Sequence, residues 1–219
     1  MRNTVSETTI GRATECLFYE GSTHRNKLMW TGYVALKRAM DLLFAIGGIV
    51  VFAPLMLLVA VLVWLDSGGP VIFKQERVGQ NGRRISILKF RTMHNGAPKY
   101  SSKVARHDPH ITRLGRFLRR SSIDELPQLI NVVRGDMSLV GPRPEQPWIV
   151  EQVYQPWQFR RLLAPPGLTG WWQVNGRSDR PMHENTELDL FYVDHQSLWL
   201  DAIILFKTIG VVLSGKGAR

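Results

Sequence analysis

The sequence contains little cysteine, fewer acidic than basic residues, and no convincing set of paired metal ligands. Cys16 is the single cysteine in 219 residues, which excludes an internal disulfide and is typical of a reducing compartment. The short cluster His107-Asp108-Pro109-His110 has neither cysteine nor a second histidine pair near it, so we do not expect zinc there. Zinc-finger and RNA-binding signatures are also missing, and we do not expect nucleic acid as a partner.

The excess of positive charge narrows the choice of partners. The 28 lysines and arginines outnumber the 18 acidic residues, and the formal net charge is +10. Beside an apolar segment, the leading acidic partners are anionic lipid headgroups and phosphorylated substrates. The N-terminal region before that segment is too polar and too mixed in charge for a cleavable signal peptide, so membrane delivery depends on the apolar run itself.

That apolar run covers residues 42–65, which are 24 residues without a charge and have Pro54 near their midpoint. A straight helix of this length would be about 36 Å long, enough to cross a hydrocarbon core of about 30 Å. Proline inside a helix removes one backbone hydrogen bond and kinks it, so a bent segment that enters and leaves by one face is the other arrangement. Length alone leaves both arrangements open.

The residues that flank the run are basic on both sides. Lys37 and Arg38 precede it, and Lys74 and Arg77 follow it. Because lysine and arginine mark the cytoplasmic side of a membrane segment, positive charge at both ends mildly favours a re-entrant hairpin. In that arrangement we expect Lys37 and Arg38 to lie near anionic headgroups.

The chain divides into three parts. Residues 1–30 lack apolar periodicity and are expected to form a weakly ordered cytoplasmic tail. Residues 31–68 form the membrane helix, which ends at the turn cluster in 66–70, and residues 69–219 form a cytoplasmic domain. In this domain, residues 71–73 and 85–90 are predicted strands joined by an Asn81-Gly82 hairpin turn. The expected class is α+β, mainly helical with a small β-hairpin.

Two further helices are predicted to be amphipathic. Residues 111–120 place one set of apolar side chains on a single face and arginines around the other, which suits a membrane surface, a polyphosphate or plain solvent. The apolar set is Ile111, Leu114, Phe117 and Leu118. Residues 198–213 are interrupted by Asp201 and Lys207, so we expect an interfacial or core helix there rather than a span.

The most informative polar segment contains Asp124 and Glu125. Ser122 and Glu125 have the spacing of a capping box, and together with Pro127 they predict a helix that begins here. The free backbone N–H groups at the N-terminus of this helix would favour a bound phosphate. The alternative is that two acids in a first turn do no more than complement the helix dipole. Further along, Arg143 stands between two prolines, which fix the backbone and present the guanidinium in a preset direction, as a phosphate clamp requires.

These segments together resemble the bacterial sugar transferases, the monotopic polyprenol-phosphate phosphoglycosyl transferases. The resemblance runs over about residues 35–215 and is specific because its motifs are long and occur in the family's order. The motifs are Lys37-Arg38 with Asp41, the apolar run with its proline, QERVGQNGR, LKFRTM, DPHITRLGRFLRRSSIDELPQLINVVRGDMSLVGPRP, PPGLTGWWQVNGR and SLWLDAIILFKTI.

The resemblance implies transfer of a sugar 1-phosphate from a UDP-sugar to undecaprenyl phosphate, with release of UMP. It implies that Asp124 is the nucleophile, that the intermediate is an aspartyl phosphosugar, and that Mg²⁺ is the cofactor with Asp124 as a ligand. We assign Glu125 to organising the metal or phosphate site, with a general-base role left open. Adjacent helical residues point about 100° apart, so the two acids are not equivalent.

Other residues are assigned more broadly. Arg143 is the expected diphosphate clamp, and further candidates for binding phosphate are Arg119, Lys89, Arg91 and Arg177. Solvated or headgroup-facing charge is the alternative for each of them. Trp171 and Trp172 could stack on uracil, anchor at the bilayer interface or pack in the core.

The resemblance also bears on the membrane segment. An enzyme that takes a lipid phosphate and a soluble UDP-sugar at one face needs the re-entrant arrangement, with Pro54 as the bend. We therefore expect the catalytic domain on the cytoplasmic face of the bacterial inner membrane, in contact with membrane lipid, with a homodimer left open. The competing interpretation is a non-catalytic, basic, membrane-anchored binding or scaffold protein, which would not explain Asp124 and Glu125 beside Arg143.

Overall fold

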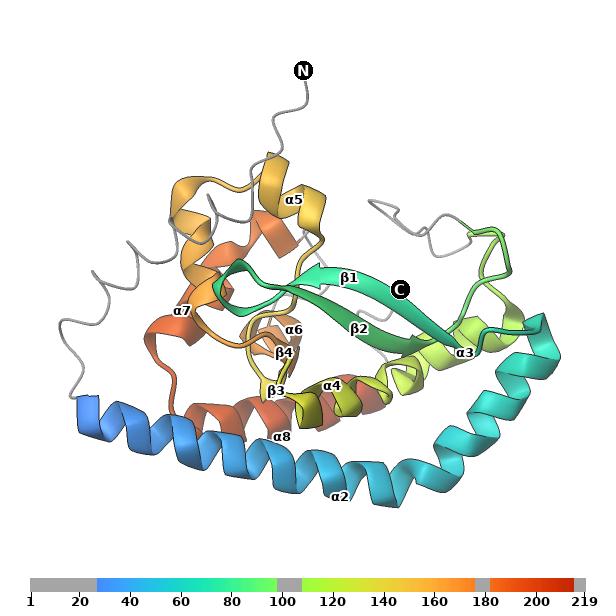
Figure 1. Cartoon of the computed structure of the whole chain (residues 1–219), viewed down its shortest axis with the longest axis horizontal. Helices are drawn as coiled ribbons and strands as arrows, with labels where there is room; N and C mark the ends of the chain where they lie inside the picture. Colours follow the sequence, from blue (N-terminus) through green and yellow to red (C-terminus); the bar gives the residue numbers. More distant parts are fainter. Residues whose placement is uncertain (1–26, 98–107, 176–181, 215–219) are drawn as a thin grey trace.

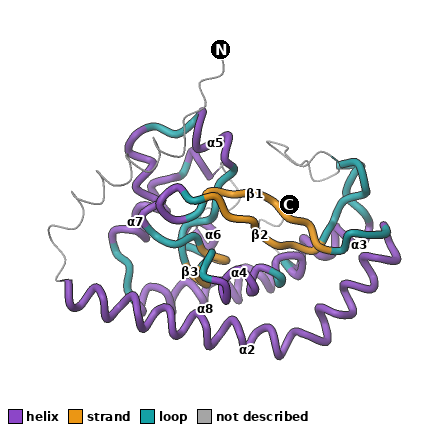
Figure 2. Tube along the Cα trace, in the orientation of Figure 1, coloured by secondary structure: helices purple, strands orange, loops and turns teal. Residues whose placement is uncertain are grey.

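The computed structural model describes residues 27–97, 108–175 and 182–214, and every structural statement below refers to these residues. Most of the predicted tail, His107 and Arg177 lie outside them. The described chain is mostly helical with two small two-stranded sheets, as Figure 2 shows by its colours. The predicted α+β class with a helical majority is confirmed at this level.

The long helix α2 (Lys27–Ser67) contains 41 residues and has Pro54 inside it. It begins before the predicted apolar run and includes it whole. Figure 1 shows α2 along the bottom of the molecule, where it changes direction and then rises at its C-terminal part. Gly68 ends the helix with a left-handed φ of 73°, and its N–H donates to the Trp64 carbonyl at 2.8 Å, so the predicted turn cluster does terminate α2.

The predicted hairpin is confirmed. Strands β1 (Ile72–Val78) and β2 (Arg84–Phe90) pair antiparallel from Ile72↔Phe90 to Val78↔Arg84. In the connecting loop, which includes η2 (Gln80–Gly82), Asn81 and Gly82 have φ values of 53° and 79°, the left-handed region that this residue pair favours. β1 extends beyond the predicted residues 71–73 through a polar stretch in which exposed Lys74 and Glu76 alternate with partly buried Gln75 and Arg77, the period-two pattern of a strand.

Short helices and a second sheet complete the domain. In chain order they are α3 (Arg113–Ser121), η3 (Ile123–Glu125), α4 (Gln128–Arg134), β3 (Ser138–Val140), α5 (Pro147–Gln152), η4 (Pro156–Leu163), β4 (Gly167–Thr169), α6 (Trp171–Asn175), η5 (Met182–Glu184), α7 (Thr186–Asp194) and α8 (Leu198–Ser214). Strands β3 and β4 pair in parallel, which the sequence did not predict.

One local prediction, the capping box at Ser122 with a helix beginning there, was wrong. Ser122 has a left-handed φ of 58° and terminates α3; its side chain makes no capping hydrogen bond, so the predicted capping box does not form. The following α-helix begins only at Gln128, after Pro127. Of the predicted apolar face of residues 111–120, Leu114 and Leu118 pack in a core cluster, Ile111 precedes α3, and Phe117 is 61% exposed.

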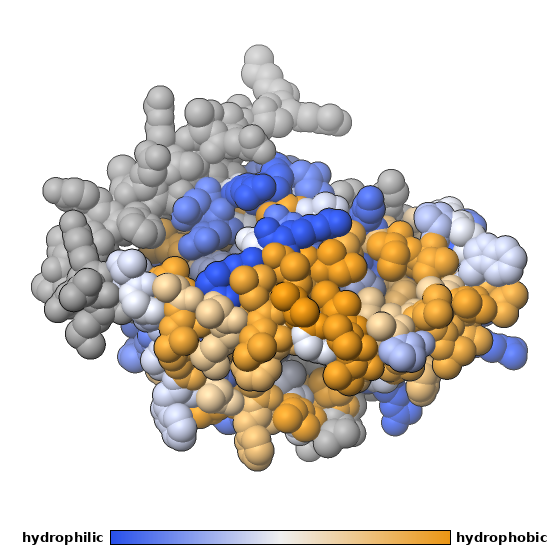
Figure 3. Space-filling model, turned by 60° about the horizontal axis from the view of Figure 1, so that its bottom comes forward, coloured by the Kyte–Doolittle hydropathy of each residue, from blue (hydrophilic) through white to orange (hydrophobic). Residues whose placement is uncertain are grey.

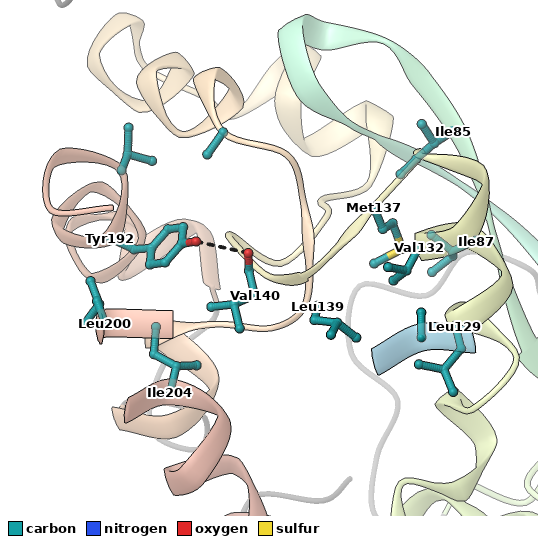
Figure 4. Packing of buried hydrophobic residues seen from close by; sticks show 13 residues of the cluster. Ile85, Ile87, Leu129, Val132, Met137, Leu139, Val140, Tyr192, Leu200 and Ile204 are labelled. Atoms are coloured by element: carbon teal, nitrogen blue, oxygen red, sulfur yellow. Dashed lines mark hydrogen bonds between the residues drawn. The ribbon is translucent and has the colours of Figure 1, made fainter. Parts of the chain in front are cut away.

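The main core joins β2, α4, β3, α7 and α8 (Figure 4). It also includes Ala45 of α2, which is fully buried. The Tyr192 hydroxyl lies beside the Val140 carbonyl at 3.1 Å and the Asp201 carboxylate at 2.8 Å, so its polar end is satisfied inside the core. Burial of each large apolar side chain in this core stabilises the folded state by about 1.5–3 kcal/mol relative to leaving it exposed.

A broad apolar surface lies opposite the hairpin. Many apolar side chains of α2 are exposed, and Figure 3 shows orange atoms across this face. Within the described residues, α2 is the one helix that length and composition would allow to cross a membrane. Helix α8 buries Leu200 and Ile204 in the core and exposes Trp199 and Phe206.

Candidate active site

Asp124 lies in η3, a single helical turn between α3 and α4. Its side chain is buried, with 8% of the residue exposed. Burial raises the pKa of Asp124 to about 6, and the nearby charge of Lys89 is the main influence that opposes this rise. No described group donates a hydrogen bond to its carboxylate, which surrounding cations influence through their charge alone. A buried carboxylate without a hydrogen bond is costly, and such groups occur at functional sites.

Glu125 has a different environment from its neighbour. Its Oε1 accepts from Lys89 Nζ at 2.6 Å and from an Arg143 NH2 group at 3.1 Å. The two cations come from β2 and from the Pro-Arg-Pro loop, so Glu125 joins two separate parts of the domain. Glu125 is therefore already paired, and Asp124 is the acid that stays available for a ligand or a reaction.

Arg143 is held in a tightly packed loop. The Pro142 carbonyl accepts from Gly167 N–H at 2.8 Å, and the Glu145 carbonyl accepts from Val78 N–H at 2.9 Å. A Cβ added at Gly141 would lie 2.2 Å from the Pro165 carbonyl oxygen, so glycine alone fits this close approach. About 30% of the Arg143 side chain stays exposed, and its guanidinium lies against the Glu125 carboxylate.

Arg119 is the third cation beside Asp124. Its charge lowers the pKa of Asp124, and burial lowers the pKa of Arg119 itself. Its Nε donates to Thr92 Oγ1 at 2.8 Å, which orients the guanidinium. The structure thus brings Lys89, Arg119 and Arg143, three of the residues expected to bind phosphate, together around the two acids.

Arg91 is placed elsewhere. Its guanidinium donates to the carbonyls of Ser67 and Gly68 and to the Asn95 side chain. These acceptors lie at and just after the C-terminal end of α2, so Arg91 braces that end and is not directed at Asp124. Arg177, the other predicted phosphate contact, lies outside the described residues.

Lys37 and Arg38, the residues expected near lipid headgroups, both have hydrogen-bond partners inside the protein. Lys37 is 7% exposed, and its Nζ pairs with Asp201 Oδ2 of α8 at 2.8 Å. Arg38 donates to the carbonyls of Val132 at 2.7 Å and Val133 at 2.9 Å, at the C-terminal end of α4. Both side chains are used inside the protein because the fold leaves a carboxylate and two helix-end carbonyls within their reach.

Asp41, a third polar residue in this part of α2, attaches the helix to β3. Its Oδ1 accepts from Leu139 N–H of β3 at 3.0 Å, and Asp41 is only 6% exposed. About one turn of α2 is thereby bonded to α8, α4 and β3.

Sequence reasoning missed Asn131 as a residue that supports the site. Asn131 is fully buried in α4; its Oδ1 accepts from Leu88 N–H at 3.0 Å, and its Nδ2 donates to the Ser86 carbonyl at 2.8 Å. The side chain thus pairs with β2 as a neighbouring strand would, next to Lys89. A lone asparagine inside the apolar helix sequence QLINVVR was the available signal.

The two adjacent tryptophans have different environments. Trp172 is 8% exposed and buried in the domain, which fits the core interpretation. Trp171 is partly buried and stacks on Phe191 with ring centroids 5.1 Å apart, while Lys207 Nζ lies 4.8 Å from the Trp171 ring centroid. Both positions stabilise the packing of α6 against its neighbours.

The described residues fit Mg²⁺ in one limited way. They contain no group of three or more histidine, cysteine, aspartate or glutamate side chains that would hold a metal by themselves. Mg²⁺ commonly takes one or two carboxylates and completes its octahedral shell with substrate phosphates and water. The free carboxylate of Asp124 satisfies that requirement.

This geometry is chemically suited to phosphate groups, with one carboxylate free of hydrogen bonds among three cations on a domain attached to a long apolar helix. The chain belongs to the bacterial sugar transferase family, whose sequence model matches residues 32–215.

Three relatives illustrate the family. The chain is 44% identical to the UDP-N-acetylgalactosamine-undecaprenyl-phosphate N-acetylgalactosaminephosphotransferase of Aeromonas hydrophila, over 85% of this chain and 46% of that protein. It is 43% identical to the UDP-galactose-lipid carrier transferase of Erwinia amylovora, over 84% and 41%. It is 37% identical to the exopolysaccharide production protein ExoY of Rhizobium meliloti, over 83% and 87%. The chain thus spans less than half of the first two, whose names give different sugars.

Proposed function

We propose that this protein is a phosphoglycosyl transferase that moves a sugar 1-phosphate from a UDP-sugar to undecaprenyl phosphate, as a membrane step of polysaccharide synthesis. The family assignment and the names of the relatives support the reaction class. The observation that carries the proposal is the contrast between the two adjacent acids. Glu125 is bonded to Lys89 and Arg143, whereas the buried Asp124 carboxylate has no hydrogen bond among the described residues.

In the first step, a carboxylate oxygen of Asp124 attacks the phosphorus that carries the sugar. The bond from that phosphorus to the bridging oxygen breaks, and UMP leaves with the electron pair, which gives an aspartyl phosphosugar. An anion that attacks a phosphate needs charge neutralisation more than proton transfer. Arg143, Lys89 and Arg119 supply positive charge at this position.

In the second step, an oxygen of undecaprenyl phosphate attacks the same phosphorus. The acyl phosphate bond to Asp124 breaks, and the free carboxylate is restored. Neither nucleophile carries a proton that must be removed at neutral pH, so no general base is needed. Glu125 then acts by holding Lys89 and Arg143 in place. A covalent intermediate of this kind gives ping-pong kinetics.

Mg²⁺ is the proposed cofactor, with Asp124 as its protein ligand. When bound, it would neutralise charge on the diphosphate. The residues of the chain perform the remaining tasks: Asp124 is the nucleophile, and the three cations orient and neutralise the phosphates.

We further propose that α2 is a re-entrant membrane helix and that the domain lies on the cytoplasmic face of the inner membrane. The support is that both arms of α2 pack on the same domain. Before Pro54, Ala45 belongs to the main core; after Pro54, Val59 and Val63 pack with Phe90 and Leu118. A straight spanning helix would carry one arm away from the domain.

The topology can be tested by cysteine labelling in a Cys16→Ser background. One cysteine is placed before residue 42 and another after residue 65, and each is treated with a membrane-impermeant thiol reagent in inverted and in right-side-out vesicles. Both positions should react from the cytoplasmic side alone. Reaction of the two positions from opposite sides would contradict the re-entrant arrangement.

The activity is tested with a panel of radiolabelled UDP-sugars, Mg²⁺ and undecaprenyl phosphate. The proposal expects label in the lipid fraction together with UMP release for at least one sugar, and both should be lost in Asp124→Asn. A basic membrane-anchored scaffold would give neither product with any donor. Activity that survives Asp124→Asn would contradict the nucleophile assignment.

A further inference from the structure

Arg161 is a buried arginine outside the cluster around Asp124. It lies in η4 and is 2% exposed. Its partner is Asp189 of α7, which is fully buried; the closest atoms of the pair, an Arg161 NH2 group and Asp189 Oδ2, are 2.5 Å apart. The other terminal nitrogen of Arg161 donates to the Tyr154 hydroxyl. The buried ion pair is thus bonded to a third residue, Tyr154, which lies between α5 and η4.

Burying the Arg161–Asp189 ion pair costs desolvation free energy. Removing two charges from water costs several kcal/mol per ion, and apolar residues of similar volume are often as stabilising or more so. Stability alone therefore does not account for an arginine and an aspartate here. A planar guanidinium with five N–H donors instead suits a position where several acceptors must be held at fixed angles.

One of those acceptors belongs to the proposed diphosphate clamp. The same NH2 group of Arg161 that pairs with Asp189 donates to the backbone carbonyl of Arg143 at 2.7 Å. The backbone groups of Gly167 and Val78 hold the carbonyls on either side, those of Pro142 and Glu145. The carbonyl of Arg143 itself accepts from a side chain, that of Arg161, which the buried carboxylate of Asp189 anchors.

The contacts form a continuous path to the reacting acids. Asp189 orients Arg161, Arg161 holds the Arg143 backbone, and the Arg143 guanidinium reaches Glu125 at 3.1 Å, beside Asp124. The loop prolines limit how far the Arg143 backbone can adjust by itself. A shift of the carbonyl would therefore move the guanidinium relative to both acids.

We propose that Arg161, held by Asp189, is a positioning residue that sets the direction of the Arg143 side chain toward the substrate diphosphate. Arg161 touches neither substrate nor Asp124 in this assignment, which rests on the proposed function. Its effect on the reaction passes through Arg143.

The first test compares Arg161→Lys with Arg160→Lys in the full chain. Lysine keeps the charge beside Asp189 but lacks the planar fork that also reaches Tyr154 and the Arg143 carbonyl. We expect Arg161→Lys to lower kcat/KM roughly ten- to hundred-fold, because small misplacements of catalytic groups cost about this much. Arg160→Lys is the matched control. Arg160 is the residue next to Arg161 and forms an exposed ion pair with Asp194, so the Arg160→Lys variant should keep wild-type kinetics.

A double-mutant cycle separates positioning from general damage. Arg143→Ala removes the group that Arg161 is proposed to direct, so Arg161→Lys should cause little further loss of kcat/KM in the Arg143→Ala background. If Arg161 served the fold alone, the two losses would multiply. Thermal unfolding of each variant identifies those that are folded.

The apolar pair Arg161→Met with Asp189→Leu covers the case in which Arg161→Lys does not fold. A folded apolar pair with reduced kcat/KM, and no further loss on addition of Arg143→Ala, supports the proposal. Wild-type kinetics in a folded variant, multiplying losses, or failure of both variants to fold would overturn it. The wild-type protein is assayed in parallel: absence of any transfer by the wild type refutes the proposed function, whereas transfer with an unaffected Arg161 variant refutes this inference alone.

Discussion

Two groups of basic residues in this protein look alike in sequence but have different surroundings. The anchoring cations, Lys37, Arg38 and Arg91, are bonded to acceptors inside the protein at the two ends of α2. The site cations, Lys89, Arg119 and Arg143, surround Asp124 and Glu125. The role of a cation is decided by the acceptors that the fold places within its reach, which composition and local pattern do not reveal.

The largest stability effect should come from an anchoring cation. Lys37→Met leaves the buried Asp201 carboxylate without its cation and should cost about 3–5 kcal/mol, whereas Lys37→Met with Asp201→Leu should recover most of this loss. Thermal unfolding in detergent measures both. Equal destabilisation of the single and double variants would show that Lys37 does not act through this pair.

Asp124 should make stability depend on pH. Its folded pKa of about 6 lies above the unfolded value of 3.8, so the folded state binds more protons between these values. The contribution of the group to stability is therefore present below about pH 4 and is lost as pH rises through about 6, by about 3 kcal/mol in total.

Asp124→Asn should remove this decline. The measurement is the unfolding free energy of both proteins from pH 4 to pH 7 without divalent cations. Transfer activity of the wild type should rise over the same pH range as the carboxylate ionises. An unchanged pH slope in the variant would assign the titration to another group.

A site cation should affect rate rather than stability. Arg143→Ala is expected to lower kcat/KM roughly 100-fold, or about 2.7 kcal/mol of transition-state stabilisation, with little change in the unfolding temperature. Steady-state kinetics with the preferred UDP-sugar provides the measurement. A folded variant with wild-type kinetics would remove Arg143 from the site.

Arg38→Ala is the matched change in the anchoring group and should have the smallest effect. It leaves the Val132 and Val133 carbonyls at the end of α4 without this donor, at a cost of about 1–3 kcal/mol. The transfer rate per folded molecule should stay near that of the wild type. A large loss of rate without a loss of stability would place Arg38 with the site cations.

Features with a local cause were predictable from the sequence. The hairpin follows from Asn81-Gly82, the end of α2 follows from the glycine–proline cluster, and the part of α2 from residue 42 to residue 65 follows from its uncharged run. The closeness of Arg143 to the two acids was expected from the presentation of an arginine between prolines and from the family resemblance.

Features that depend on distant partners were not predictable. Strands β3 and β4 pair in parallel across a long intervening segment. Ser122 lost its predicted capping role because its left-handed backbone ends one helix and begins a turn. Asn131 and Arg161 support the site by bonding backbone groups whose availability depends on the complete fold.

The central claim is that Asp124 is the nucleophile, and capture of the intermediate tests it most directly. The protein is incubated with Mg²⁺ and a UDP-sugar labelled at the phosphate next to the sugar, without undecaprenyl phosphate, and is then quenched, digested and analysed by mass spectrometry. The account predicts a sugar-phosphate adduct on the Asp124 peptide that is absent in Asp124→Asn and is discharged when undecaprenyl phosphate is added. Label that reaches the lipid without ever binding the protein, in the wild type and in Asp124→Asn alike, would contradict it.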